Sequence, residues 1–168
     1  NSVNIGCEVD YPDPRSIGAD RLANVAAAVS LYEVPAVIID FGTAVTFDVV
    51  SSKKSYLGGV IAPGLASMTD YMFDHTALLP RIDLNEPSTI IGKSTEDAML
   101  SGAVIGYRGL VKEVIYSIFN DLDEPAIQVI ATGGYAQLIS SAIKEINIVN
   151  DSLTLEGLRI IADLNPFS

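Results

Sequence analysis

The sequence contains one cysteine, Cys7, one histidine, His75, and no tryptophan. A single cysteine excludes an internal disulfide and a cysteine-based zinc site. A single histidine excludes a histidine-rich metal centre. From this cysteine usage we expect a reducing, cytoplasmic setting for the protein.

Basic residues are also scarce. Ten Lys and Arg stand against 21 Asp and Glu, which gives a formal net charge of −11. Nucleic acids and anionic membranes are bound through clustered Lys and Arg, so we expect neither as a partner. No apolar run reaches the roughly 20 residues that a membrane-spanning helix needs. A single phosphate site remains compatible with this charge, because backbone N–H groups and a metal ion can hold phosphate.

Apolar residues are abundant, at 49% of 168, so the chain can bury a sizeable core. Periodicity and turn residues predict three consecutive strands, followed by helices that alternate with strands. The expected strands cover 36–40, 44–50, 56–61, 127–131 and a short piece near 146–149. Five helices are expected. The first has Asp20 as its N-cap, the second covers 65–79, and the third runs from Ser94 or Thr95 to about Leu122. The fourth follows residue 134, and the last starts near Ser152.

This order predicts an α/β fold of the ribonuclease-H-like (actin-like ATPase) kind, with three antiparallel strands and then alternating helices and strands. An all-parallel three-layer fold fits less well, because "SSKK" is too short for a parallel crossover. We predict that residues 36–168 form a C-terminal ribonuclease-H-like domain. Residues 1–35 are then the remnant, the C-terminal end, of a second domain of the same kind.

The stretch "DFGTAVTFD", residues 40–48, combines a strand-end carboxylate with a tight turn. Asp40 can bind a cation, Gly42 lets backbone approach a phosphate, and the hydroxyls of Thr43 and Thr46 can donate to phosphate oxygens. An ordinary β-hairpin with polar residues at its tip explains the pattern equally well.

Two shorter stretches also suggest chemistry. In "IGADR", Asp20 is a candidate general base and Arg21 a candidate anion contact, although an N-capping Asp beside an exposed Arg is the more ordinary interpretation. In "ATGGY", the paired glycines Gly133 and Gly134 would let a ligand lie against backbone, and a plain strand-to-helix turn is the alternative. Tyr11 is either a surface aromatic or one wall of a ligand pocket.

Taken in order, seven stretches resemble the type III pantothenate kinases of the sugar kinase, heat-shock and actin superfamily. They are "GADR", "DFGTAVTFD", "GGVIAPG", "LLPRIDL", "GKST", "SGAVIGYRG" and "ATGGYAQLI". The resemblance implies transfer of the γ-phosphoryl group of ATP to pantothenate, giving 4′-phosphopantothenate in the first step of coenzyme A biosynthesis. It also implies Mg²⁺ with ATP, a monovalent cation (K⁺ or NH₄⁺), and a cytoplasmic homodimer.

The resemblance further implies a role for each matching residue. Asp20 matches the general base and Asp40 the monovalent-cation ligand. The pantothenate side comprises Tyr11, Gly18, Ala19 and Arg21, together with Thr95, which a second subunit contributes. The ATP side comprises Thr43, Thr46, Gly133 and Gly134.

One family feature is missing from this sequence. Family members begin with a strand and a "D-x-G-N-T"-like hairpin that binds Mg²⁺–ATP, and no such motif occurs here. We therefore expect the chain to be an incomplete portion of such a kinase, inactive by itself. The alternatives are a pantothenate-kinase-like transcription accessory protein and another kinase of the actin-like fold.

Overall fold

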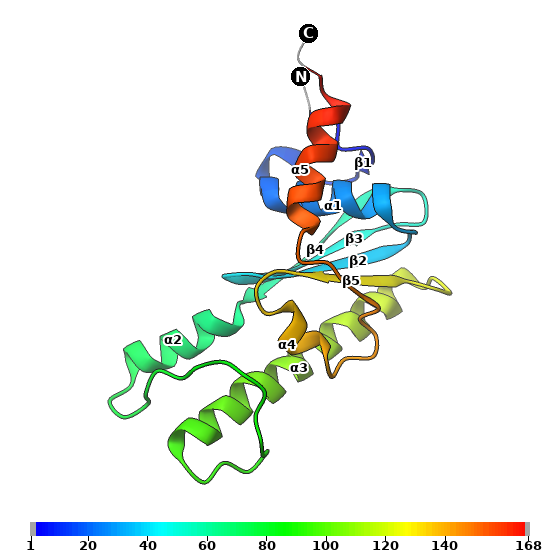
Figure 1. Cartoon of the computed structure of the whole chain (residues 1–168). Helices are drawn as coiled ribbons and strands as arrows, with labels where there is room; N and C mark the ends of the chain where they lie inside the picture. The colour runs from blue at the N-terminus through cyan, green and yellow to red at the C-terminus, as the bar shows by residue number, and fades with distance from the viewer. Residues whose placement is uncertain (1–2, 167–168) are drawn as a thin grey trace.

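The computed structural model describes residues 3–166, which form a mixed six-stranded sheet with helices on both faces (Figure 1). The strand order is β1-β4-β3-β2-β5-β6. The strands are β1 (Glu8–Val9), β2 (Ala36–Phe41), β3 (Ala44–Val50), β4 (Ser55–Pro63), β5 (Gln128–Thr132) and β6 (Ile148–Val149). The predicted α/β class is confirmed.

Strands β2, β3 and β4 form an antiparallel meander, as the short links predicted. In β2 and β3, Ala36 pairs with Val50 and Asp40 with Thr46. β5 then pairs with β2, and β6 with β5, both in parallel. β1 adds two residues parallel to β4 at the other edge, a strand that the sequence did not predict.

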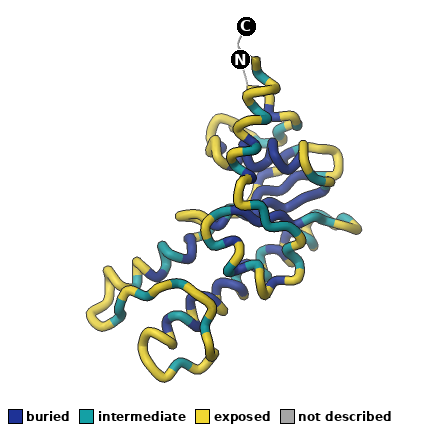
Figure 2. Tube along the Cα trace, viewed as in Figure 1, coloured by how far each residue is buried: buried dark blue, intermediate teal, exposed yellow. Residues whose placement is uncertain are grey.

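Helices cover both faces of the sheet (Figure 1). α1 (Ala19–Leu31) and α5 (Leu153–Leu164) share one face, while α3 (Thr95–Leu122) and α4 (Ala136–Ser140) share the opposite one. Because strand side chains alternate, Ala36 and Ile38 of β2 face α1, whereas Ile39 and Phe41 belong to the α3-side core. The buried residues concentrate in these two layers beside the sheet (Figure 2).

α1 and α5 approach each other closely. A Cβ added at Gly157 of α5 would lie 1.8 Å from the carbonyl oxygen of Ala23 in α1. Ala23 and its neighbours Ala26, Ala27 and Ala28 are fully buried, so small side chains permit the contact. The short 3-10 helix η1 (Pro14–Ser16) leads into α1.

α2 (Leu65–His75) and the first turns of α3 extend away from the sheet (Figure 1). The prediction that α2 continues to residue 79 was wrong. The helix ends at His75, and Thr76 has extended backbone, four residues before Pro80. Pro80 disfavours helical conformation at Leu79, the residue at which the predicted helix was to end.

A buried arginine is one of the residues that join the loop from 76 to 94 to the body of the molecule. Arg108 of α3 donates two hydrogen bonds to Glu86, at 2.9 and 2.6 Å. It also donates to the carbonyl of Leu138 at 2.6 Å and to Ser141 Oγ at 3.0 Å. One guanidinium thus connects the loop, α3 and the end of α4.

α3 begins as predicted. Ser94 is its N-cap and accepts a hydrogen bond from the N–H of Asp97 at 3.0 Å. Gly102, Gly106 and Gly109 of α3 do not pack closely against another element of the described chain. A Cβ added at any of them would meet nothing within 4 Å. Among the helices of residues 3–166, none combines the length and the apolarity required to cross a membrane.

Candidate functional site

The N-terminal turn of α1 carries Asp20 at the molecular surface. The N-cap is Gly18, which makes no side-chain cap, so the interpretation of Asp20 as N-cap was wrong. Asp20 lies in the first turn, where the helix dipole favours a negative charge. Its Oδ1 would be 2.5 Å from a Cβ added at Gly18, so the absence of that atom makes room for the carboxylate.

Arg21, the next residue, turns inward to a buried polar cluster. Its Nε donates to Oδ1 of Asp48 at 2.8 Å, and its Nη2 donates to the hydroxyl of Tyr56 at 2.7 Å. That hydroxyl donates to the same Asp48 oxygen at 2.9 Å, and Thr46 Oγ1 donates to Oδ2 at 3.3 Å. Burial lowers the pKa of Arg21, but hydrogen bonding and attraction from Asp48 outweigh it and raise the pKa above its ordinary value. The guanidinium is therefore charged.

Tyr11 lies beside this cluster. Its ring centroid is 6.1 Å from that of Tyr56, and the two rings are tilted by 35°. A Cβ added at Gly58 would be 3.3 Å from Tyr11 Cε2, and one at Gly59 would be 3.2 Å from Nη2 of Arg21. The two glycines of β4 thus let both side chains lie close to the strand.

Asp40, near the end of β2, is half-buried and held by α1. Its Oδ2 accepts a hydrogen bond from Nδ2 of the buried Asn24 at 3.0 Å. The Oδ1 of Asn24 in turn accepts from Thr154 of α5 at 2.7 Å. Burial raises the pKa of Asp40, the bond from Asn24 lowers it, and the nearby negative charge of Asp20 raises it. The two candidate carboxylates, Asp20 and Asp40, therefore lie within electrostatic reach of each other.

The turn between β2 and β3 is tied to the start of α2. The carbonyl of Thr43 accepts hydrogen bonds from the N–H of Gly64 at 3.0 Å and from Ser67 Oγ at 2.7 Å. These bonds use the backbone of Thr43, and its side chain is exposed. Thr46 lies not in the turn but within β3, opposite Asp40, where its hydroxyl bonds to Asp48.

The loop after β5 meets the end of β2 at Gly133. This glycine has φ of +93°, and an added Cβ would be 2.6 Å from Asp40 Oδ1 and 2.7 Å from the nitrogen of Phe41. Only glycine fits such a position, because an L side chain would be strained and would clash. A Cβ at the neighbouring Gly134 would have nothing within 4 Å, so that backbone faces open space.

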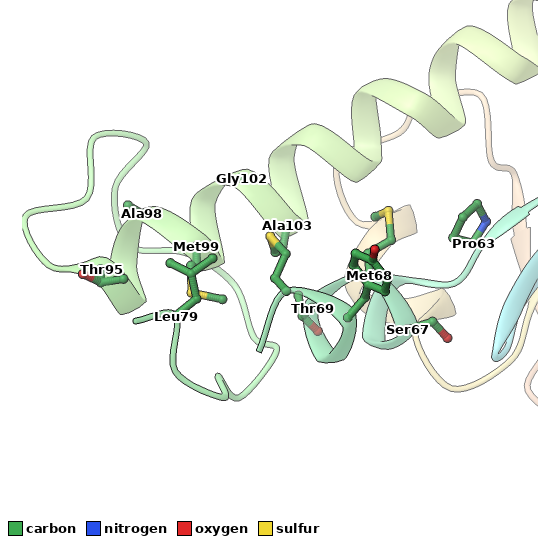
Figure 3. Close-up of a pocket in the computed structure, with 12 residues that line it drawn as sticks. Pro63, Ser67, Met68, Thr69, Leu79, Thr95, Ala98, Met99, Gly102 and Ala103 are labelled. Carbon is green, nitrogen blue, oxygen red and sulfur yellow. The ribbon is translucent and has the colours of Figure 1, made fainter. Parts of the chain in front are cut away.

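Thr95 is not brought to the other candidate residues within this chain. It begins α3, at the far end of the molecule from α1 (Figure 1). There it lines an apolar groove of about 860 Å³ between α2 and α3, together with Met68, Met72, Leu79, Met99 and Gly102 (Figure 3).

Three residues of this region were missed by the sequence interpretation: Asn24, Asp48 and Tyr56. Asp48 closes the quoted "DFGTAVTFD" stretch and shares a strand face with Thr46, since the two are two residues apart. Asn24 follows Asp20 by one helical turn. Those spacings were readable, whereas the pairing of Tyr56 with Arg21, 35 residues apart, was not.

Comparison with protein families gives a match to the family described as type III pantothenate kinase, over residues 1–117. A type III pantothenate kinase of Akkermansia muciniphila is 57% identical over 96% of this chain. Those of Methylacidiphilum infernorum and Finegoldia magna are 48% and 41% identical, each over 97% of it. The chain spans 66%, 60% and 63% of the lengths of these three relatives.

A solved structure has a similar fold. It is a Campylobacter jejuni protein described as a conserved candidate transcriptional activator of the Baf family. The TM-score is 0.63 with 25% sequence identity, over 95% of this chain and 69% of the other.

Proposed function

This chain belongs to the type III pantothenate kinase family, and from that premise we propose that the whole protein phosphorylates pantothenate. The γ-phosphoryl group of ATP passes to the primary hydroxyl of pantothenate, ADP leaves, and the hydroxyl proton is taken up by a base. The observation that carries the proposal is the identity of 41–57% to curated kinases over nearly the whole chain. The placement of Asp20 and Asp40 supports it, because Asp40 is bonded to Asn24, one helical turn after Asp20, and phosphoryl transfer needs a base and a cation near one point.

In this proposal Asp20 is the general base toward the acceptor hydroxyl. Its surface position in the first turn of α1 leaves the carboxylate open to a substrate. Arg21 contacts the carboxylate of pantothenate, and Tyr11, Gly18 and Ala19 line the same pocket. The contacts that Tyr11 and Arg21 share around Tyr56 support a common pocket for them.

ATP, accompanied by Mg²⁺, would lie along the β2–β3 turn and the loop after β5. The exposed hydroxyl of Thr43 and the open backbone at Gly134 suit phosphate and nucleoside contacts, with Gly133 keeping the two loops together. Thr46 was assigned a phosphate contact as well. In the described structure its hydroxyl donates to Asp48, so a direct contact with phosphate requires that hydroxyl to rotate toward the nucleotide.

Asp40 suits a monovalent cation. Asn24 occupies Oδ2, and Oδ1 faces the glycine loops. A bound cation would offset both the burial of Asp40 and the repulsion from Asp20. Within residues 3–166 no three acidic, cysteine or histidine side chains gather as a metal site, so backbone, water or nucleotide oxygens would complete the shell.

We further assign the sheet to the ribonuclease-H-like arrangement. A meander of β2, β3 and β4 followed by two parallel strands supports this assignment. The division of the chain at residue 36 remains a prediction. α1 precedes that division, yet it shares a buried core with β2 and α5, which follow it. The single cysteine supports a cytoplasmic location.

A homodimer accounts for the position of Thr95. The groove beside Thr95 is apolar, and Gly102 within it has room for a neighbouring chain. Thr95 would then reach the pantothenate pocket of a second copy, which its distance from α1 in one chain otherwise prevents.

The test is Asp20→Asn in the complete protein encoded by the reading frame that contains this chain. A general base contributes roughly 10²–10⁴-fold, so kcat for ATP-dependent phosphorylation of pantothenate should fall by that factor without loss of folding. Asp163→Asn, an exposed aspartate of α5, is the charge-matched control and should keep full activity. Full activity in Asp20→Asn would refute the base assignment, and an unsubstituted protein without turnover would refute the function.

A further inference from the structure

The buried cluster around Arg21 leaves one edge of its guanidinium unused. Nε and Nη2 are bound by Asp48 and Tyr56, while no hydrogen bond joins Nη1 to any residue in the described part of the chain. The side chain is 11% exposed, so it is enclosed but not sealed. A guanidinium carries five N–H donors in a fixed plane, and the Nη1 donors are the ones that remain for a ligand.

Asp48, the partner of Arg21, is a buried carboxylate within the sheet. It is fully buried, and its two oxygens accept from Arg21, Tyr56 and Thr46. A buried carboxylate with these donors is fixed in orientation, and it fixes the arginine that it binds. Tyr56 is also fully buried, and it bonds to both partners, closing a three-membered ring of hydrogen bonds.

β4 is shaped to accept the guanidinium. A Cβ at Gly59 would lie 3.2 Å from Nη2 of Arg21 and 1.7 Å from the carbonyl oxygen of Phe47. Arg21 therefore lies against bare backbone on one side and against Asp48 and Tyr56 on the other. Few alternative rotamers fit in that space, so the direction of the Nη1 edge is set before any ligand arrives.

Because the charge of Asp48 offsets that of Arg21, the pair has no net charge and attracts an anion only weakly from a distance. Its selectivity then depends on donors that already point in the right direction. We propose that Asp48 and Tyr56 are positioning residues that hold Arg21 with its Nη1 edge toward the substrate carboxylate, and that this fixed guanidinium selects the acidic substrate over uncharged analogues. The inference rests on the proposed function and deepens it.

The experiment compares two substrates in the complete protein: pantothenate and its primary amide, which keeps the acceptor hydroxyl but lacks the negative charge. The key variant is Tyr56→Phe, which removes one hydroxyl and preserves ring and charge. A hydrogen-bonded contact to a charged group is worth about tenfold or more in binding. We expect the KM for pantothenate to rise by about that factor, with kcat and the KM for the amide nearly unchanged.

Two further variants separate positioning from a structural role. Arg21→Lys keeps the charge but has no fork, and it should lose the same preference for pantothenate. Adding Tyr56→Phe to Arg21→Lys should then cause no further loss, because Tyr56 acts only through the fork. Tyr32→Phe is the matched control: it removes the acceptor of a hydrogen bond from Asn150 at the other end of α1 and should leave the preference intact.

Asp48→Asn covers the case in which Tyr56→Phe does not fold, and its substrate preference is expected to fall in the same way. Thermal unfolding of each variant confirms that folded protein is compared. An unchanged preference in folded, active Tyr56→Phe or Asp48→Asn overturns the inference alone. Equal losses for both substrates also overturn it, since these indicate structural damage. Absence of pantothenate turnover in the unsubstituted protein overturns the proposed function and this inference with it.

Discussion

The carboxylate of Asp40 is held in the folded chain at an energetic cost. It is half-buried, has one donor in Asn24, and feels the negative charge of Asp20. Burial and that repulsion raise its pKa above the ordinary value of 3.8. A group whose pKa is higher in the folded than in the unfolded state lowers stability as the pH rises past its ordinary value. A carboxylate whose ionisation costs the fold stability is typical of a functional site, which is the role that we propose for Asp40.

We therefore predict that Asp40→Asn makes the 168-residue chain more stable at neutral pH. The amide oxygen can still accept from Asn24, and the ionisation cost disappears. The difference in unfolding free energy between variant and parent should be near zero below pH 3.8. It should grow as the pH rises through the raised pKa and then level off. Urea unfolding at a series of pH values measures it.

The neighbouring carboxylate supplies the comparison for that measurement. Asp20→Asn removes a charge that raises the pKa of Asp40, so the stability gained by Asp40→Asn at neutral pH should be smaller when it is measured in the Asp20→Asn background. A parent chain whose stability increases over this pH range relative to Asp40→Asn would contradict the argument.

At the scale of elements, the strongest constraint is the contact between α1 and α5. Gly157 lets the backbone of α5 approach Ala23, and Asn24 then bonds to Thr154 across the same interface. The position of Asp40 depends on this packing, because Asn24 is the residue that holds it. The packing of α1 against α5 therefore helps to fix the position of Asp40 in the candidate cation site.

Gly157→Ala should destabilise the chain by about 1–3 kcal/mol or more, the usual cost of overpacking. An added methyl cannot be accommodated 1.8 Å from a carbonyl oxygen without separating the helices. Gly109→Ala in α3 is the control: its Cβ would meet nothing within 4 Å, so better helix propensity should give a gain of about 0.5–1 kcal/mol. Denaturant unfolding of both variants decides, and a neutral Gly157→Ala would show that α5 can move away.

The elements that the sequence predicted well are those with many repeats of one period. The meander and the long helix α3 fall where strand alternation, turn residues and the Ser94 cap indicated. β1 was not predicted because a strand of two residues is too short to show an alternating pattern. The end of α2 was predicted too late because apolar residues continue beyond His75. In the candidate site, sequence neighbours such as Asp20 and Arg21 could be singled out together, whereas the buried partners of Arg21 could not. Asp48 and Tyr56 lie 27 and 35 residues away, and nothing local indicates such pairing.

On the scale of the whole molecule, one region of the described chain projects from the sheet and its covering helices. α2, the loop that follows it and the start of α3 extend from the body, and this part is mostly exposed (Figure 2). Tyr71, which lines the groove beside Thr95, and Leu78, Ile90 and Ile91 of the following loop are each more than 60% exposed there. An apolar surface of this extent typically marks an interface.

A second copy of the chain seated on this groove would cover it, and we predict that the protein sediments as a dimer. Met72→Glu places a charge in the groove between α2 and α3, and burying an unpaired charge costs far more than the apolar contact it replaces. This variant should therefore sediment as a folded monomer, with an unchanged circular dichroism spectrum. Leu155→Glu, which alters a 70%-exposed leucine of α5 outside the groove, should remain a dimer. A monomeric parent chain, or a Met72→Glu variant as dimeric as its parent, would exclude the groove as the interface and leave the position of Thr95 without its explanation.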